Sequence, residues 1–464
     1  MKATTTSPDS GQRQRWRYVT LSAVAALLSA ATAVLSAAVA QLTLWTDLCS
    51  DTATHPTATV HVVAPASAPS ALWVLEEALR DANVNVRTAT DDDDVAADAP
   101  FTKLPVLGTT TTSTDVVWEH RIAFPGVERP CHALARGQRY NHAPVWEWLV
   151  AKPRMGFLAR ELGWSFVPET IVLAEDLAPT DDVATITQPA FMWLAKDPHH
   201  RHVKLLEIPP SEHDWRTELS KGVVFQRRVV RPWLVDGRSC DVGVYVLVEG
   251  DNVHAFDDVL LRCAAVPYTS KLRRADGDDD DEGEKEMEEV VVPGVPEQRA
   301  VVIEEDYLDA AQLPSLSSVH AHTQSTRKAL VELLGADARQ WTIGVTDAIS
   351  TALSGARRAG SPVPAVPRAA CGWHTTLPVA LQPRAWPCGL NDHFFELLRF
   401  DFIFNRTLHP HLVEVNASPN LKPRNELQTK LLRRHMRGVV SRVILRRGGD
   451  VNDGWLSLED WNLV

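Results

Sequence analysis

Hydrophobic positions recur along the chain in patterns that predict both strands and helices. Apolar residues with helical spacing at 71–79 lie between two short apolar runs, so residues 57–90 are predicted to form a strand, a helix and a strand. The same reasoning predicts strands at 115–124 and 190–197 and a strand pair at 223–250. Helices are predicted within 140–176, at 324–356 and at 426–447, the last of which is basic and amphipathic.

The pattern at 392–421 predicts a polar site. Residues 395–421 are expected to form two strands joined by a tight turn, with 401–404 folded back against 412–416. The stretch at 392–404 is also expected to be a helix that runs into this strand pair. Because strand side chains alternate between faces, Glu414 and Asn416 point the same way, and the turn brings Asp401 beside them. Such oxygen donors of mixed charge suit Mg²⁺. The alternative is a hairpin with one face in water.

The N-terminal segment predicts a membrane anchor. No charged residue occurs from Tyr18 to Trp45, which is long enough to span a bilayer, and basic residues precede this run. We expect a cytosolic tail at 1–17, a signal anchor at 18–45 and a stem at 46–56, which gives a single-pass type II membrane protein with a lumenal or extracellular globular part. The alternative is a cleaved signal peptide, since Ala-Val-Ala at 38–40 precedes Gln41.

Composition limits the remaining possibilities. The 464 residues exceed one small core, and the net charge of −12 argues against general nucleic-acid binding. Acidic or Thr-rich stretches at 91–114 and 271–290 are expected to be disordered. The expected divisions are an α/β subdomain at 57–185, a larger part at 186–447 and a tail at 448–464. The six cysteines can pair in 15 ways, and no CxxC spacing indicates zinc.

Several motifs in series resemble one family. Asp401 followed by Glu-Val-Asn-Ala-Ser-Pro-Asn-Leu at 414–421 is similar to the C-terminal signature of the tubulin–tyrosine-ligase-like family, a branch of the ATP-grasp ligases. Residues 223–248, with Gln226 and the Asp-Gly-Arg-Ser-Cys-Asp stretch at 236–241, resemble its central segment. Residues 140–176 and 191–197 resemble its Asn-His helix and Trp-Ile-x-Lys strand. The similarity extends over about 115–440.

The resemblance implies a fold and roles. The expected fold is α+β, an ATP-grasp fold with the nucleotide held between two α+β subdomains, after the membrane helix. Asp401, Glu414 and Asn416 would hold Mg²⁺, while Lys196 would contact the phosphates and Gln226 and Arg227 the adenine. Arg238 and Asp241 would line the substrate side as catalytic residues.

The implied reaction is ATP-dependent ligation. An amino acid, glutamate, would be joined through an acyl phosphate to a protein acceptor such as tubulin or another acidic protein. Three departures favour an alternative, a catalytically impaired, membrane-tethered binding module. The stretch at 197–206 lacks the glycines of the family's phosphate loop, Gly243 replaces an expected arginine, and no His-Leu-Thr-Asn segment is recognisable. A tubulin acceptor, which is cytosolic, also conflicts with a lumenal domain.

Overall fold

The computed structural model describes residues 58–64, 72–90, 116–119, 138–172, 193–197, 203–206, 217–268, 271–272, 289–290, 302–303, 306–360, 394–417, 419–446 and 453–463. The predicted tail, anchor and stem at 1–56 and the linker at 91–114 lie outside these residues. Within the described part of the chain, no helix combines the length and the apolar character needed to cross a bilayer.

The first sheet along the sequence is parallel and has four strands, in the order β2-β1-β3-β4. The predicted strand, helix and strand at 57–90 are present here. Helix α2 buries Val74, Leu75 and Leu79, the apolar positions whose spacing indicated a helix. The bounds are β1 (Thr59–Ala64), α2 (Trp73–Asp81), β2 (Asn85–Thr90), β3 (Val116–Glu119) and β4 (Arg139–Tyr140).

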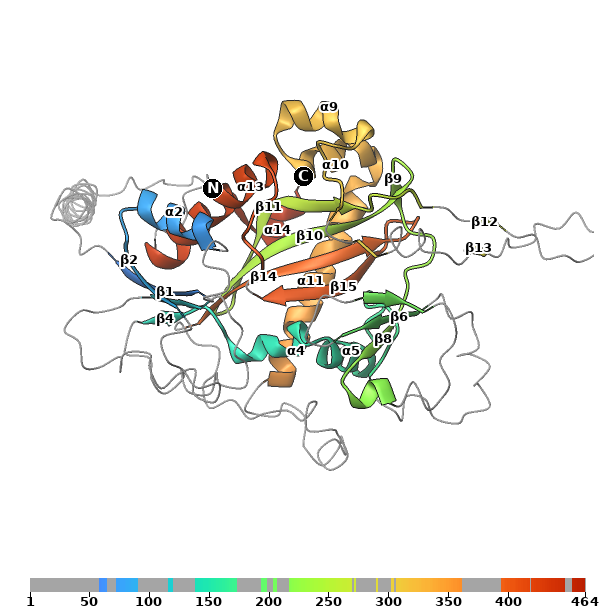
Figure 1. The fold of residues 1–464 in the computed structure, drawn as a ribbon, viewed down its shortest axis with the longest axis horizontal. Coiled ribbons are helices and arrows are strands. Elements are labelled where there is room, and N and C mark those ends of the chain that lie inside the picture. Colours follow the sequence, from blue (N-terminus) through green and yellow to red (C-terminus); the bar gives the residue numbers. More distant parts are fainter. Residues whose placement is uncertain are drawn as a thin grey trace, which may run out of the picture. The chain divides into compact units, whose positions relative to one another are not determined.

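The central sheet is antiparallel, and its main path runs β15-β14-β10-β11-β16, with β9 paired to β10 (Figure 1). Trp455 begins β16, so the segment expected as a C-terminal tail adds a strand to this sheet. The bounds are β9 (Leu234–Val235), β10 (Arg238–Glu249), β11 (Asn252–Cys263), β14 (Phe395–Phe404), β15 (Pro410–Ala417) and β16 (Trp455–Ser457).

Strand β14 corrects the predicted helix at 392–404. Nine of its ten residues are buried, so both faces of the strand are covered. A strand in that position carries an almost continuous apolar run, and a short run of this kind cannot be told from a buried helix by its periodicity. Phe395–Phe404 is therefore a single strand that pairs with β10 on one side and β15 on the other.

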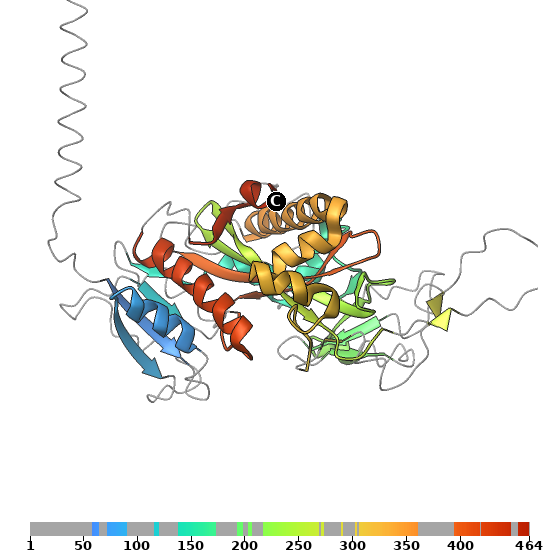
Figure 2. The same ribbon diagram turned by 90° about the horizontal axis from the view of Figure 1, so that it is seen from above.

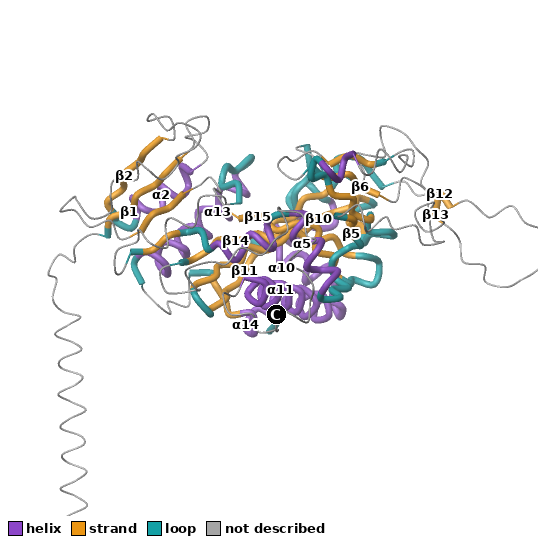
Figure 3. Tube along the Cα trace, turned by 90° about the horizontal axis from the view of Figure 1, so that it is seen from below, coloured by secondary structure: helices purple, strands orange, loops and turns teal. Residues whose placement is uncertain are grey.

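Helices cover one face of the central sheet. Phe400, Phe402 and Phe404 of β14 belong to the core that the helix α11 residues Trp341 and Val345 also form. Figure 3 shows α10, α11 and α14 grouped together along this sheet. Residues 324–356 are helical as predicted, with a break at Gly335. The bounds are α9 (Pro314–Thr323), α10 (Thr326–Leu334), η6 (Gly335–Asp337), α11 (Ala338–Gly360) and α14 (Leu458–Trp461).

A smaller antiparallel sheet, in the order β5-β8-β6-β7, supplies the second layer of the site. Helix α5 packs against β5, where Gly156 lies so close to Thr170 that a Cβ atom would be 2.7 Å from its methyl carbon. The bounds are η3 (Pro144–Trp146), α4 (Glu147–Val150), α5 (Lys152–Glu161), β5 (Thr170–Ile171), β6 (Trp193–Lys196), β7 (Val203–Leu205) and β8 (Val224–Arg227).

Two further features complete the fold. The basic helix predicted at 426–447 is α13 (Glu426–Val439), which lies alongside α2 (Figure 2) and continues into the π-helix η8 (Val440–Ile444). The two ends of the acidic stretch at 271–290 form paired strands, β12 (Lys271–Leu272) and β13 (Glu289–Val290). Residues 273–288 lie outside the described part.

A buried ion pair ties the first sheet to the central one. His142, which follows β4, lies with Nδ1 3.2 Å from Oε1 of Glu396 on β14, and both side chains are fully buried. Burial alone would lower the pKa of His142, but the Glu396 carboxylate outweighs it and the pKa is raised. The Asn-His stretch quoted for the resemblance therefore has a structural role in this chain.

Candidate functional site

Lys196 joins the small sheet to the central sheet. It ends β6, is only 6% exposed, and donates through Nζ to Oε1 of Gln226 on β8 at 2.6 Å. It also donates to the carbonyl oxygen of Val413 on β15 at 3.0 Å. Asp401 pairs with Glu414 while Phe402 pairs with Leu412, so Val413 is an extra residue in the ladder. A bulge leaves such a residue unpaired, which makes its carbonyl available to Lys196.

Burial disfavours the charged form of Lys196 and so lowers its pKa. Desolvation is the largest influence on it and lowers the pKa of Lys196 to about 8, although Glu414 nearby acts in the opposite direction. The amine is therefore still protonated at neutral pH, and it becomes neutral at mildly alkaline pH.

The face of the central sheet turned away from α11 carries charged groups. Asp401 on β14 is 1% exposed, and its carboxylate accepts two hydrogen bonds from Arg399, from Nε at 2.7 Å and from Nη2 at 2.8 Å. Asn416 on β15 donates to the same carboxylate at 3.0 Å. These contacts confirm that β14 and β15 present their polar residues on one side, as the alternation of strand residues predicted.

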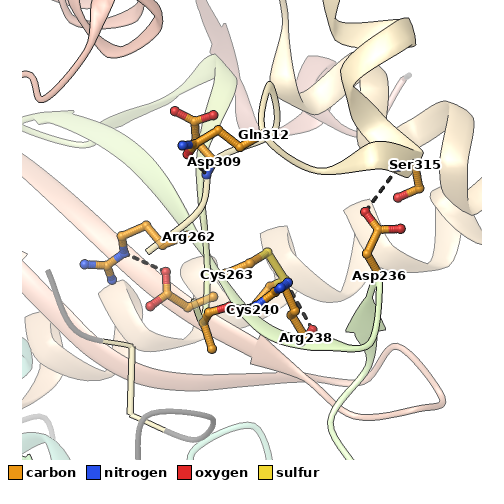
Figure 4. Close-up of a disulfide and its surroundings, with 10 residues drawn as sticks. Asp236, Arg238, Cys240, Arg262, Cys263, Asp309, Gln312 and Ser315 are labelled. Carbon is orange, nitrogen blue, oxygen red and sulfur yellow. Dashed lines mark hydrogen bonds and ion pairs between the residues drawn. A yellow bond between two sulfur atoms is a disulfide. The ribbon is translucent and has the colours of Figure 1, made fainter. Parts of the chain in front are cut away.

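Arg262 on β11 connects this group to a second acid. Its Nε donates to Asp241 on β10 at 2.7 Å, and its Nη2 donates to Asp401 at 3.2 Å. Figure 4 shows Arg262 next to the disulfide between Cys240 and Cys263, which joins the neighbouring positions of the same two strands. This disulfide is one of the pairings that the sequence left open.

The two aspartates have opposite electrostatic character. Desolvation raises the pKa of Asp241 to about 6, and Arg262 only partly opposes it. Burial would also raise the pKa of Asp401, but the Arg399 and Arg262 guanidinium groups outweigh it and hold the pKa below its ordinary value. Asp401 is therefore ionised over the whole physiological range, in an ion-pair network that two arginines neutralise.

Glu414 lies at the edge of this network. Its carboxylate pairs with Lys152 at the start of α5 at 3.1 Å, and its side chain keeps 34% of its exposure. Burial would raise the pKa of Glu414, but Lys152 outweighs it and the pKa is lowered. An ionised, partly exposed carboxylate of this kind has room to accept a ligand.

Two predicted site residues make their hydrogen bonds away from the Asp401 carboxylate. Arg238 donates to the carbonyl oxygens of Ala264 and Ala265, so it holds the turn that follows β11. Arg227 lies at the end of β8 and donates to Glu169 at 3.4 Å. The other six predicted residues, namely Asp241, Lys196, Gln226, Asp401, Glu414 and Asn416, lie around the contact between the two sheets.

Three positively charged side chains of this site were not identified from the sequence. Arg399 precedes Asp401 by two residues, a spacing that places both on one face of a strand, but the stretch was interpreted as a helix. Arg262 and Lys152 come from elements whose pairing with the site is not visible in local sequence.

The residues fit a divalent cation only in part. Four donor groups occupy the Asp401 carboxylate, namely Arg399 Nε and Nη2, Arg262 Nη2 and Asn416 Nδ2. A carboxylate has about four lone-pair positions, so little capacity for a metal remains on Asp401. Glu414 retains such capacity, and Mg²⁺ often takes only one or two protein carboxylates together with phosphate oxygens.

The cavity beside Lys196 has side chains of the kinds that bind a nucleotide base. Gln226, Leu194 and Val413 line a narrow cavity of about 20 Å³ between the small sheet and the central sheet. Its lining combines the hydrogen-bonding side chains of Gln226, Arg227 and Arg228 with apolar residues, a mixture that purine sites also use. Its volume is that of a water site, so a purine enters only if the two sheets separate.

Comparisons with known proteins identify a family and a relative. The model of the tubulin-tyrosine ligase family matches residues 135–281 and 379–449, which include the segments carrying Lys196, Gln226, Asp241, Asp401 and Glu414. The chain is also 25% identical over 335 residues, 69% of its length, to a probable tubulin polyglutamylase, ttll-15, from Caenorhabditis elegans. It spans 54% of that protein's length.

The predicted localisation is wrong on these findings. A single-pass type II membrane protein with a lumenal or extracellular domain was expected, with the anchor at 18–45. The relative is named for activity on tubulin, a cytosolic protein that a lumenal domain would not meet. No membrane-spanning helix occurs among the described residues, and 18–45 lie outside them.

Proposed function

The chain belongs to the tubulin-tyrosine ligase family, and from this premise we propose that it is an ATP-dependent ligase that modifies a protein acceptor. The amino acid that it adds is glutamate, and the acceptor is tubulin or another protein with an acidic surface. The glutamate assignment follows the relative, which is named a tubulin polyglutamylase.

One observation carries the proposal. Lys196 bridges the two sheets and lies beside the face that holds Glu414, Asp401 and Asp241. A cation at the end of a small sheet, facing acids on a larger sheet, is what a site needs in order to place nucleotide phosphates next to an acceptor carboxylate. In such a site positioning and charge neutralisation supply most of the rate of phosphoryl transfer.

The reaction proceeds in two steps. A substrate carboxylate oxygen attacks the terminal phosphorus of ATP, the bond to the bridging oxygen breaks, and an acyl phosphate and ADP form. An amine then attacks the acyl carbon, phosphate leaves, and the amine loses a proton as the amide bond forms.

The chain's residues have matching roles. Lys196 and Lys152 would offset the negative charge of the phosphates, and Glu414 would hold the divalent ion, a role that was predicted for Asp401 and Asn416 as well. Gln226 would border the adenine. The divalent ion, when bound, neutralises charge on the phosphates. Asp241, with a pKa raised to about 6, borders the substrate side and can accept a proton near neutral pH.

A second candidate is a nucleotide- or protein-binding module with impaired transfer. The occupied carboxylate of Asp401 favours it, because a ligand position for metal is then lost. Gly243 and the glycine-free stretch at 197–206 favour it as well, since each removes a group that the resemblance expects at the phosphates.

The test compares binding with transfer in the purified full chain. We expect the wild-type chain to bind ATP and to transfer labelled glutamate to tubulin. Glu414→Gln should abolish transfer, whereas the control Glu332→Gln, at an exposed position of α10, should not change it. Binding without transfer, unaffected by Glu414→Gln, would support the second candidate. Absence of any ATP binding would refute the ligase and the nucleotide-binding module, and would leave only a protein-binding module.

A further inference from the structure

We infer that Arg399, together with Arg262, takes the place of a metal ion as the positive charge on Asp401. The terminal phosphates of a nucleoside triphosphate then bind at this face without a divalent cation on Asp401. The inference rests on the proposed function, because it concerns how the proposed nucleotide site holds its phosphates.

The first argument concerns space. Gly243 on β10 lies opposite Asp401 on β14 in the sheet. A Cβ atom on Gly243 would lie 3.0 Å from Cδ of Arg399 and 3.0 Å from Oδ1 of Asp401. The side chain of Arg399 therefore covers this position, where the resemblance expects an arginine. A guanidinium group is still present at this face, but it comes from the neighbouring strand.

The second argument concerns geometry. Arg399 contacts Asp401 through two nitrogens at 2.7 Å and 2.8 Å, the bidentate arrangement that is strong and specific. Arg262 adds a third contact to the same carboxylate. A metal ion could take both oxygens of Asp401 only after these donors had left. Arg399 would then be a buried cation without its carboxylate partner, and Arg262 would keep only Asp241.

The third argument concerns charge. Seven charged side chains gather at this face. The acids are Asp241, Asp401 and Glu414, and the bases are Lys152, Lys196, Arg262 and Arg399. Four bases against three acids leave one net positive charge before any metal binds. Without Arg399 the net charge of this group would be zero, and only Arg262 would offset the charge of Asp401.

The fourth argument concerns access. Arg262 retains 20% of its side-chain exposure, and it uses Nε and Nη2 for the two aspartates. Its third nitrogen, Nη1, makes no hydrogen bond to a described residue. It can therefore donate to a phosphate oxygen while the ion pairs stay in place. A divalent ion that arrives with the nucleotide is then left with Glu414 as its carboxylate.

The experiment measures how much ATP binding depends on metal. A fluorescent ATP analogue is titrated into the full chain in EDTA and again in MnCl₂. For the wild-type chain we expect the two dissociation constants to agree within about threefold. For Arg399→Ala we expect binding in EDTA to be weaker by about tenfold or more, because one positive charge is lost at this face and Arg262 alone is left to offset Asp401. Mn²⁺ should restore binding, because the two positions that Arg399 occupied on the Asp401 carboxylate are then open to it.

Two controls make the result specific. Arg437→Ala removes an exposed arginine of α13 that pairs with Asp81, and it should behave as the wild type does. The double variant Arg399→Ala/Asp401→Asn should lose the rescue by Mn²⁺, and electron paramagnetic resonance should show correspondingly weaker Mn²⁺ binding. Should Arg399→Ala fail to fold, Arg399→Gln removes the charge and keeps a hydrogen-bonding group.

The possible outcomes separate the two proposals. Binding of ATP by the wild-type chain that falls tenfold or more in EDTA, to the same extent as in the Arg399 variant, overturns the inference and leaves the ligase proposal in place. Equal behaviour of wild type and Arg399→Ala also overturns it. No binding of ATP by the wild type, with or without Mn²⁺, refutes the nucleotide site itself and this inference with it.

Discussion

Replacement of Lys196 by methionine tests whether the buried charge is kept for function. Burial lowers the pKa of Lys196 from 10.5 to about 8, a cost of roughly 3 kcal/mol for the charged form, at about 1.4 kcal/mol per unit. Methionine of similar length removes that cost but leaves Oε1 of Gln226 and the Val413 carbonyl without their donor, at about 1–3 kcal/mol. At pH 7.5 we therefore expect nearly equal stability and strongly weakened ATP binding.

The sign of the pH effect follows from linkage. Between pH 8 and pH 10.5 the unfolded chain keeps the proton on residue 196 and the folded chain does not, so wild-type stability rises with pH across this window. Relative to Lys196→Met, the wild type should gain about 2 kcal/mol between pH 7.5 and pH 9.5.

Urea unfolding of both proteins at the two pH values measures this difference. The exposed Lys328→Met is the matched control, and it should show no such gain. A difference between wild type and Lys196→Met that stays constant, or that moves against the wild type at pH 9.5, would refute the reasoning.

Three further predictions concern stability. Replacing Cys240 and Cys263 by serine should lower the free energy of unfolding by about 3 kcal/mol, since the disulfide closes a loop with a sequence separation of 23, and a reducing agent should have the same effect only in the wild type. Gly438→Ala should cost about 1–3 kcal/mol, because its Cβ atom would lie 2.5 Å from a backbone carbonyl oxygen; an unchanged melting temperature would contradict this. Glu396→Gln should cost about 3–5 kcal/mol, because it removes the negative charge that faces the buried His142, and chemical denaturation would show it.

The sequence predicted those site residues that depend on local pattern. Glu414 and Asn416 lie on one face because strand residues alternate, and this can be read from any short strand. Lys196 and Gln226 were identified through the resemblance, and the structure brings them within 2.6 Å of each other. Arg238 followed from the same resemblance, but its side chain is held by the turn after β11.

The omission of Arg399 has the same cause as the wrong helix. In a helix, residues 399 and 401 point in different directions, whereas in a strand they share a face. Once 392–404 was interpreted as a helix, Arg399 could not be placed beside Asp401. Arg262 was beyond local reasoning altogether, because its contact with Asp401 depends on how β11, β10 and β14 align.

The contact of Lys196 with Gln226 and Val413 closes the small sheet onto the central one, over a cavity of about 20 Å³. A purine ring is far larger, so adenine reaches Gln226 only when this lysine has released its partners. The form that accepts ligand is then a minor population, and the measured affinity is lower than the intrinsic one by that fraction. The observed rate of nucleotide binding would then reach a maximum as the ATP concentration rises. That maximum is the rate at which the two sheets separate.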